Sequence, residues 1–155
     1  MIGKLFLRPA YLLSRLHRQL LHSVTMGVRI LLVQEGQVLL VRHTYNPGWQ
    51  FPGGSLKHGE NTAQGAVREA FEETGVRVLG EPRLLGVFTN SGEGHSDHII
   101  TFVAENFVQE RATDRWEIAE VRSFPLDELP AGLSAGYQRR IRDYLAGGGP
   151  QVGAW

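Results

Sequence analysis

The sequence has 155 residues, of which 42% are hydrophobic and 21% are charged. This length and composition fit one compact domain with a hydrophobic core. They exclude two full domains, a disordered chain and a collagen-like repeat. Cysteine is absent from the sequence. A disulfide framework, a zinc–cysteine cluster and a thiol nucleophile are therefore excluded as well.

The formal charges cancel overall but are distributed unevenly. The chain has 16 basic and 16 acidic residues. Residues 1–25 contain four of the basic residues and no acid, which leaves 12 basic against 16 acidic residues in the remainder. A neutral total gives no general attraction for a nucleic acid, so nucleic acid is not an expected partner. The acidic remainder suits a site that holds cations.

Residues 1–25 place apolar residues at helical spacing between basic ones, which predicts an amphipathic helical extension. Three roles are open for this extension: packing on the domain or on a second subunit, lying on a membrane surface, or removal as a transit-type segment. Its apolar runs are too short to span a bilayer, so we expect no membrane span and a cytoplasmic protein. A homodimer built through residues 1–25 or by strand exchange is a further expectation.

Residues 26–146 show strand and helix patterns that predict one α/β domain. Strands are predicted at 28–33 and 38–42, as a hairpin, and at 83–89, 98–107 and 117–124. Helices are predicted at 62–74 and 134–145. A glycine-rich tail over 147–155 follows, and we expect it to be frayed at 147–150. This order of elements predicts a mixed sheet covered by helices.

The helix at 62–74 has an apolar face and an opposite acidic face that contains Glu69, Glu72 and Glu73. Carboxylates at positions i, i+3 and i+4 repel one another, so a cation is expected beside them. Glutamate oxygens favour Mg²⁺ or Mn²⁺ over zinc, and Mg²⁺ keeps positions for water and phosphate. A solvated acidic face is the alternative, but Arg68 and the glycines of the preceding loop argue for a phosphate-chemistry site.

The segment from Gly54 to Val76 resembles the Nudix box, with the pattern G, five residues, E, seven residues, R-E-U-x-E-E-x-G-U, where U is a bulky aliphatic residue. All its fixed positions are met, namely by Gly54, Glu60, Arg68, Glu69, Glu72, Glu73 and Gly75. Ala70 is smaller than usual at the first U position. The likeness extends from about Met26 to Leu145 and implies an α/β/α sandwich around a mixed β-sheet.

For function, the resemblance implies hydrolysis of a phosphoanhydride bond in a nucleoside diphosphate linked to another moiety, with Mg²⁺ or Mn²⁺. ADP-ribose, a dinucleoside polyphosphate and a nucleoside triphosphate are examples of such a small-molecule substrate. Two alternatives stay open: removal of pyrophosphate from an RNA 5′ end, and a non-catalytic module that binds a nucleotide and regulates a partner. The isomerase branch of the fold uses a catalytic cysteine and is excluded by its absence.

Carried onto matching positions, the resemblance makes Glu69, Glu72 and Glu73 the metal ligands, with the backbone carbonyl of Gly54 as a further ligand. Arg68 is expected to orient Glu69 or Glu72, because a guanidinium can hold two carboxylates at once. A carboxylate outside the box is expected to act as general base. Glu93, Asp97, Glu117 and Glu120 are available, and the order of preference is Glu120, Glu93 and Glu117.

Other residues are candidates for contacts with the substrate. Arg42 and His58 are candidates for binding phosphate. Trp49 and Phe51 either stack on a base or pack the loop that contains them. His43, His95 and His98 are expected to have no catalytic part. Asn61, three residues before Gln64, predicts a capping box at the helix start.

Overall fold

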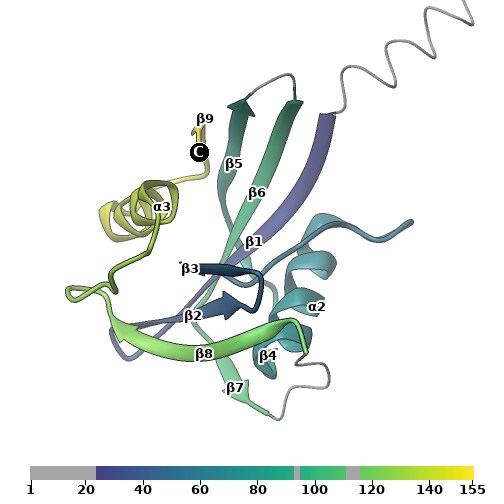
Figure 1. Ribbon diagram of the computed structural model, residues 1–155. Helices are drawn as coiled ribbons and strands as arrows, with labels where there is room; N and C mark the ends of the chain where they lie inside the picture. The colour runs from purple at the N-terminus through teal and green to yellow at the C-terminus, as the bar shows by residue number, and fades with distance from the viewer. Residues whose placement is uncertain (1–23, 93–94, 111–115) are drawn as a thin grey trace, which may run out of the picture.

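The computed structural model describes residues 24–92, 95–110 and 116–155 (Figure 1). The predicted amphipathic extension lies outside the described residues up to residue 23. Its last two residues, Val24 and Thr25, belong instead to the first strand, β1 (Val24–Gln34). Strand β1 thus includes two residues that were predicted to belong to the extension.

A mixed sheet of seven strands forms the centre of the described part of the chain. Besides β1 it contains β2 (Gln37–His43), β3 (Asn46–Gln50), β5 (Arg83–Gly92), β6 (His95–Ala104), β8 (Ile118–Pro125) and β9 (Gln151–Ala154). The strand order is β3-β2-β1-β6-β5-β9, and β8 pairs with β2. The pairs β1–β6 and β5–β9 are parallel and the others antiparallel, which confirms the prediction of a mixed sheet. The short strands β4 (Val76–Val78) and β7 (Phe107–Gln109) pair separately.

The predicted hairpin of β1 and β2 turns at Glu35 and Gly36. Both residues have positive φ, at 52° and 74°. Such a two-residue turn matches the twist of the strands that it joins, and glycine adopts the required conformation without strain.

Two helices, α2 (Thr62–Thr74) and α3 (Ala135–Ala146), lie on opposite sides of the sheet (Figure 1). One hydrophobic layer lies between the sheet and each helix. Alternate residues of β1 pack into these two layers, because successive side chains of a strand point to opposite faces of the sheet. Ile30 and Leu32 pack in the layer that contains Ala66 of α2. Leu31 packs in the layer that contains Tyr137 of α3. The predicted α/β/α sandwich is confirmed.

The chain after α3 differs from the predicted frayed tail. Gly147 and Gly148 have φ of 69° and 105° and reverse the chain, because glycine adopts this region freely. Strand β9 then runs parallel to β5, with Thr89 opposite Ala154. The following residue, Trp155, packs edge-on against Tyr137, with ring centroids 5.0 Å apart. The expectation of a frayed tail was therefore wrong.

Among the described residues, neither helix is long and apolar enough to cross a membrane.

Candidate active site

The loop that precedes α2 is fixed along β1. The N–H groups of Val28 and Ile30 donate to the carbonyls of Gly54 and Pro52, both at 2.9 Å. A side chain at Gly53 would place its Cβ 2.1 Å from the carbonyl oxygen of Val28, and the φ of Gly53 is 152°. Only glycine fits there, so the sequence forces this loop close against the sheet.

Helix α2 has both ends defined by its own sequence. The Asn61 side chain accepts from the N–H of Gln64 at 2.9 Å, and the Gln64 side chain accepts from the N–H of Asn61 at 3.1 Å. This reciprocal pair confirms the predicted capping box. Gly75 ends the helix in the left-handed conformation with φ of 71°. Ala70 is fully buried against the sheet, so its small size lets the helix approach closely.

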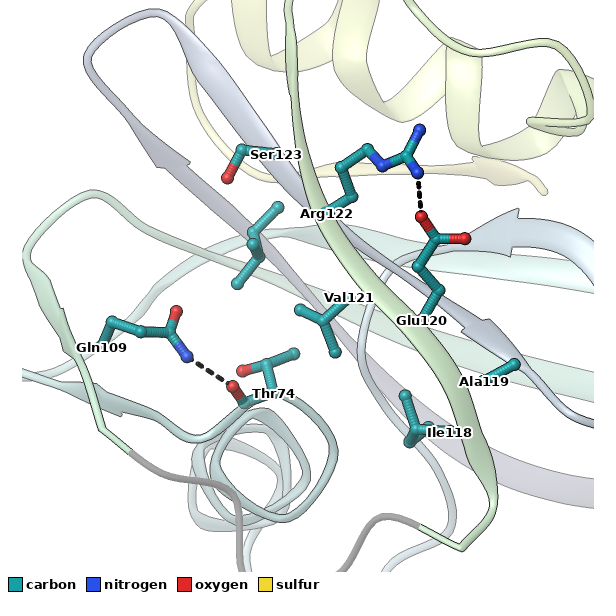
Figure 2. A pocket seen from close by; sticks show the side chains of 9 residues that line it. Thr74, Gln109, Ile118, Ala119, Glu120, Val121, Arg122 and Ser123 are labelled. Carbon is teal, nitrogen blue, oxygen red and sulfur yellow. Dashed lines mark hydrogen bonds and ion pairs between the residues drawn. The ribbon is translucent and has the colours of Figure 1, made fainter.

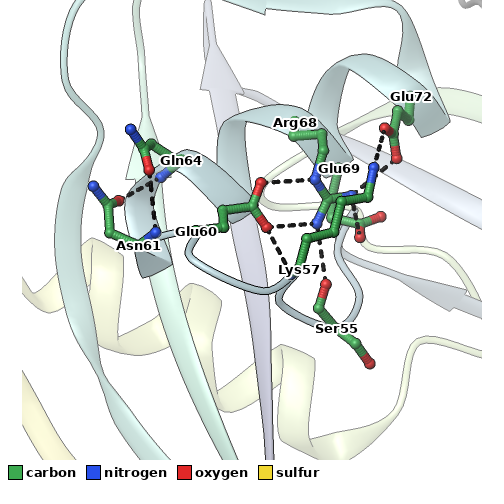
Figure 3. A network of polar contacts seen from close by, with 8 residues as sticks. All are labelled: Ser55, Lys57, Glu60, Asn61, Gln64, Arg68, Glu69 and Glu72. Atoms are coloured by element: carbon green, nitrogen blue, oxygen red, sulfur yellow. Dashed lines mark hydrogen bonds and ion pairs between the residues drawn. The ribbon is translucent and has the colours of Figure 1, made fainter.

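Arg68 is the centre of a network that joins the helix to the loop (Figure 3). Its guanidinium donates to Glu60 at 2.8 Å, to Glu69 at 2.7 Å and to Glu72 at 2.9 Å. It also donates to the carbonyl of Ser55 at 3.0 Å. These bonds to Arg68 hold the pKa of Glu60 well below its usual range, at about 2. Arg68 therefore orients both Glu69 and Glu72, where the sequence predicted one or the other.

The absence of a side chain at Gly54 allows Glu69 to approach the loop. A Cβ at Gly54 would lie 2.7 Å from Oε1 of Glu69. The carbonyl of Gly54 accepts one hydrogen bond from Val28, which leaves its second lone pair free. Gly54 and Glu69 are therefore neighbours, and both carry oxygen atoms of the kind that bind a hard cation.

Glu73 is the most enclosed carboxylate of the helix. Its Oε2 accepts from the N–H of Gly53 at 2.9 Å, and its Oε1 lies 3.4 Å from Nε2 of His43. Burial, with the nearby charges of Glu69 and Glu117, raises the pKa of Glu73 to about 7. Burial and the charge of Arg29 lower the pKa of His43. His43, which the sequence assigned no catalytic part, lies at the end of β2 in direct proximity to Glu73.

The donor set of this site suits a hard divalent cation. Glu69, Glu72, Glu73 and the carbonyl of Gly54 supply only oxygen atoms, which Mg²⁺ and Mn²⁺ prefer. As the described side chains stand, no three acidic or histidine groups converge closely enough to hold one ion. Arg68 and Lys57 occupy oxygens of Glu69 and Glu72 instead. The oxygen atoms of these residues are thus of the kind that binds a divalent cation, and Lys57 and Arg68 compete with the cation for the oxygens of Glu69 and Glu72.

A pocket of about 330 Å³ adjoins the loop at Gly54. Its lining residues are Thr25, Met26, Gly27, Arg29, Gly54, Ser55, Asn90, Asp97, Ile99, Tyr137 and Trp155. The positive charge of Arg29 acts on Glu73 and on Tyr137, so this pocket and the carboxylates share one electrostatic environment. Sequence reasoning missed Arg29. Its signal was one arginine inside the otherwise apolar strand 28–33.

Two predicted substrate contacts belong to the core instead. Phe51 is 0% exposed and packs on Tyr137, with ring centroids 4.9 Å apart. Trp49 is 8% exposed and packs edge-on against Phe124 at 4.8 Å. Phe51 thus has no free face for stacking on a base, and Trp49 has almost none. Of the two predicted roles for these aromatic residues, packing is the one that the structure shows. His58 is exposed in the loop before α2.

Glu120 is paired with two arginines. It lies 2.5 Å from Arg42 and also pairs with Arg122. Figure 2 shows the pair with Arg122. Arg42 lies over the Trp49 ring, at 5.5 Å, so these charged groups gather at Trp49. The charges that raise the pKa of Glu73 come from Glu69 and Glu117. Glu120 thus has two arginine partners, whereas Glu117 is a carboxylate outside the box whose charge acts on Glu73. Glu93 lies outside the described residues.

Comparison with known proteins identifies the family. A family model described as the NUDIX domain matches residues 22–145. A MutT-like protein of Streptomyces ambofaciens is 30% identical over 132 residues, which cover 85% of this chain and 82% of that protein. A putative 8-oxo-dGTP diphosphatase of Bacillus subtilis (strain 168) is 28% identical over 124 residues, 79% of this chain and 81% of that protein.

A solved structure agrees with these relatives. The crystal structure of a mutator MutT protein from Bacillus halodurans aligns with a TM-score of 0.70 and 26% identity, over 83% of this chain and 86% of that chain. The chain belongs to the Nudix hydrolase family. It is a pyrophosphohydrolase of a family that generally uses divalent metals.

Proposed function

We propose that this enzyme hydrolyses a phosphoanhydride bond in a nucleoside diphosphate derivative, such as ADP-ribose, a dinucleoside polyphosphate or a nucleoside triphosphate, with Mg²⁺ or Mn²⁺. One observation carries the proposal. Gly54 lies against the carboxylate of Glu69 and also lines the 330 Å³ pocket. A molecule in the pocket would therefore have its phosphates beside the carboxylates of α2. The name of the Bacillus subtilis relative, a putative diphosphatase of a modified nucleotide, supports the same substrate class.

The carboxylates and two arginines have separate roles in this proposal. Glu69, Glu72, Glu73 and the Gly54 carbonyl would hold the metal, which when bound polarises a phosphoryl oxygen and lowers the pKa of a water molecule. Arg68 fixes Glu69 and Glu72 through hydrogen bonds of 2.7 and 2.9 Å. Arg29 supplies a fixed positive charge on the pocket side, which stabilises negative charge on transferring phosphate.

Glu117 is our preferred general base. Its charge acts on Glu73, on His43 and on Tyr45, so it belongs to the same group of residues. Its backbone carbonyl accepts from the N–H of Thr44 at 2.9 Å, which ties the start of β8 to the end of β2 near His43. Glu117 can accept a proton from an attacking water because its carboxyl side chain is exposed.

The test is a hydrolysis panel of ADP-ribose, NADH, diadenosine polyphosphates, nucleoside triphosphates and triphosphorylated RNA, each with Mg²⁺, Mn²⁺ or EDTA. Glu73→Gln should lower turnover by orders of magnitude, because it keeps the shape and removes a metal-binding charge. Glu110→Gln is the matched control, since Glu110 is exposed and pairs only with Arg77 among the described residues. Near-normal rates of Glu73→Gln in saturating Mg²⁺ would refute the role of Glu73. Turnover of RNA alone would refute the proposed substrate class.

A further inference from the structure

A row of side chains at the pocket crosses the neighbouring strands β1, β6 and β5 and ends at Trp155, which directly follows β9. Thr25 of β1 lies opposite Asp97 of β6, and Asp97 lies opposite Asn90 of β5. Thr89 lies opposite Ala154 of β9, so the next residues along these parallel strands are Asn90 and Trp155. Residues opposite one another in a sheet point to the same face. Thr25, Asp97, Asn90 and Trp155 accordingly all line the same pocket.

Trp155 is held firmly in this row. Its N–H donates to the carbonyl of Thr89 at 2.9 Å, and its own carbonyl accepts from Arg139. A Cβ at Gly136 of α3 would lie 2.4 Å from Nε1 of Trp155, so the indole reaches the helix only because residue 136 is glycine. Arg140 donates to the carbonyl of Ala154 at 3.0 Å and holds the strand end. The indole is thus a rigid wall of the pocket.

We propose that this row binds the base of the substrate nucleotide, with Trp155 contacting the base plane and Asp97 and Asn90 contacting its edge. The inference rests on the proposed function, because it assumes a nucleotide whose phosphates lie at Gly54. An aromatic wall beside a carboxylate and an amide suits a planar ring that carries hydrogen-bond donors. Trp155 and Asp97 are therefore specificity-determining residues of this enzyme.

The charges of the lining favour a base over a second cluster of phosphates. Arg29 is the one basic residue among the described lining residues, and Asp97 is acidic. A substrate with several phosphates in this pocket would be repelled by Asp97 and would need more cations. The volume of about 330 Å³ falls within the roughly 300–1,000 Å³ of small-molecule pockets.

The orientation of the row also fits an elongated nucleotide. Gly54 and Ser55 line one part of the pocket. Asn90 and Asp97 come from the ends of β5 and β6, and Trp155 directly follows β9. Arg29 lies on β1 with Thr25, and its charge reaches Glu73. A nucleotide with phosphates near Arg29 and Gly54 would place its base toward the Asp97 end of the pocket.

The test measures binding without turnover. Calorimetry in EDTA compares AMP, CMP, GMP and UMP with ribose 5-phosphate, which has the sugar and phosphate but no base. Trp155→Ala should weaken nucleoside monophosphate binding about tenfold, the size expected for one lost stacking contact, and leave ribose 5-phosphate binding unchanged. Trp155→Phe should restore most of the affinity. Val152→Ala is the control, since Val152 lies on the same strand and is 88% exposed.

Asp97→Asn provides a second test that does not disturb the core. A carboxylate only accepts hydrogen bonds, so the unmodified protein should bind bases with an amino group more tightly than UMP. An amide also donates, so Asp97→Asn should narrow that difference. Equal losses for ribose 5-phosphate and the nucleotides in Trp155→Ala, or an unchanged base order in Asp97→Asn, would overturn the proposal. Base-selective binding without metal-dependent hydrolysis would instead overturn the proposed function alone.

Discussion

Nε2 of His43 lies 3.4 Å from Oε1 of Glu73, where both side chains are largely buried. Burial favours the neutral form of each group: it raises the pKa of Glu73 to about 7 and lowers that of His43. The two residues come from β2 and α2, far apart in the sequence. The burial of Glu73 makes the charge of this carboxyl group dependent on pH near neutrality.

In metal-free protein, Glu73 should lower the free energy of unfolding as the pH rises from about 4.5 to about 7. Over that range the carboxyl group of Glu73 keeps its proton in the folded state and has released it in the unfolded state. The folded state therefore loses stability relative to the unfolded state as the pH rises. The expected contribution is about 3 kcal/mol, from an ordinary pKa of 4.5 and a folded value of about 7. His43 acts in the opposite direction, since its lowered pKa favours the unfolded state at acid pH.

Urea unfolding in EDTA between pH 5 and pH 8 checks this prediction. The difference between the unmodified protein and Glu73→Gln isolates the carboxyl contribution. We expect that difference to change by about 3 kcal/mol in favour of the variant as the pH rises. Parallel curves for the two proteins would show that Glu73 has an ordinary pKa.

Arg68→Lys should lower both turnover and stability. A lysine keeps the charge but cannot form the forked contacts to Glu60, Glu69 and Glu72. We expect turnover to fall about tenfold or more and the free energy of unfolding to fall by about 1–2 kcal/mol. Arg77→Lys is the control, because its pair with Glu110 is exposed and should change stability by less than about 0.5 kcal/mol. Equal effects of the two substitutions would contradict the central role of Arg68.

Gly54→Ala should reduce turnover while changing stability little. The new Cβ would lie 2.7 Å from Oε1 of Glu69, and that carboxylate can swing away because it ends a flexible side chain. Displacement of a ligand by about 1 Å can cost about a hundredfold in rate. Gly149→Ala is the control, since nothing lies within 4 Å of a Cβ there. Steady-state kinetics with a thermal unfolding curve measures both effects, and an unchanged rate would remove Gly54 from the site.

Asn61→Ala should lower the free energy of unfolding by about 1 kcal/mol, because it removes the side-chain acceptor of the Gln64 N–H, while the Asn61 N–H can still donate to Gln64. The matched substitution is Ser134→Ala at the start of α3. The Ser134 side chain makes no capping hydrogen bond, so its loss should cost only a few tenths of a kcal/mol. Urea unfolding of both variants would distinguish these values, and equal losses would contradict the assignment of the cap.

Local chemistry made helix α2 predictable from the sequence. Asn61 and Gln64 define its start, Gly75 its end, and the spacing of the glutamates its acidic face. The hairpin was equally predictable, because Gly36 separates two apolar runs and glycine readily adopts the positive φ of a two-residue turn. These features depend on residues close together in the chain.

The rest of the site depends on contacts between distant segments. His43 meets Glu73, and Trp155 meets Asn90, only after the sheet has formed. The sequence around Trp49 and Phe51, next to the box, is typical of a loop. The pairing of β3 with β2 nevertheless directs the side chain of Trp49 into the core. Strand β9 has no alternating pattern, since its sequence is Gln-Val-Gly-Ala. No local signal could have predicted these placements.

Strand β5 pairs in parallel with β9, and β1 pairs in parallel with β6. Contacts between such distant segments form late, because long loops must close before they are made. During synthesis, the hairpin and the carboxylates of α2 are made before β9, so the pairing of β5 with β9 waits until residues 151–154 have been added. The acidic helix can therefore form before the pocket wall that Trp155 provides.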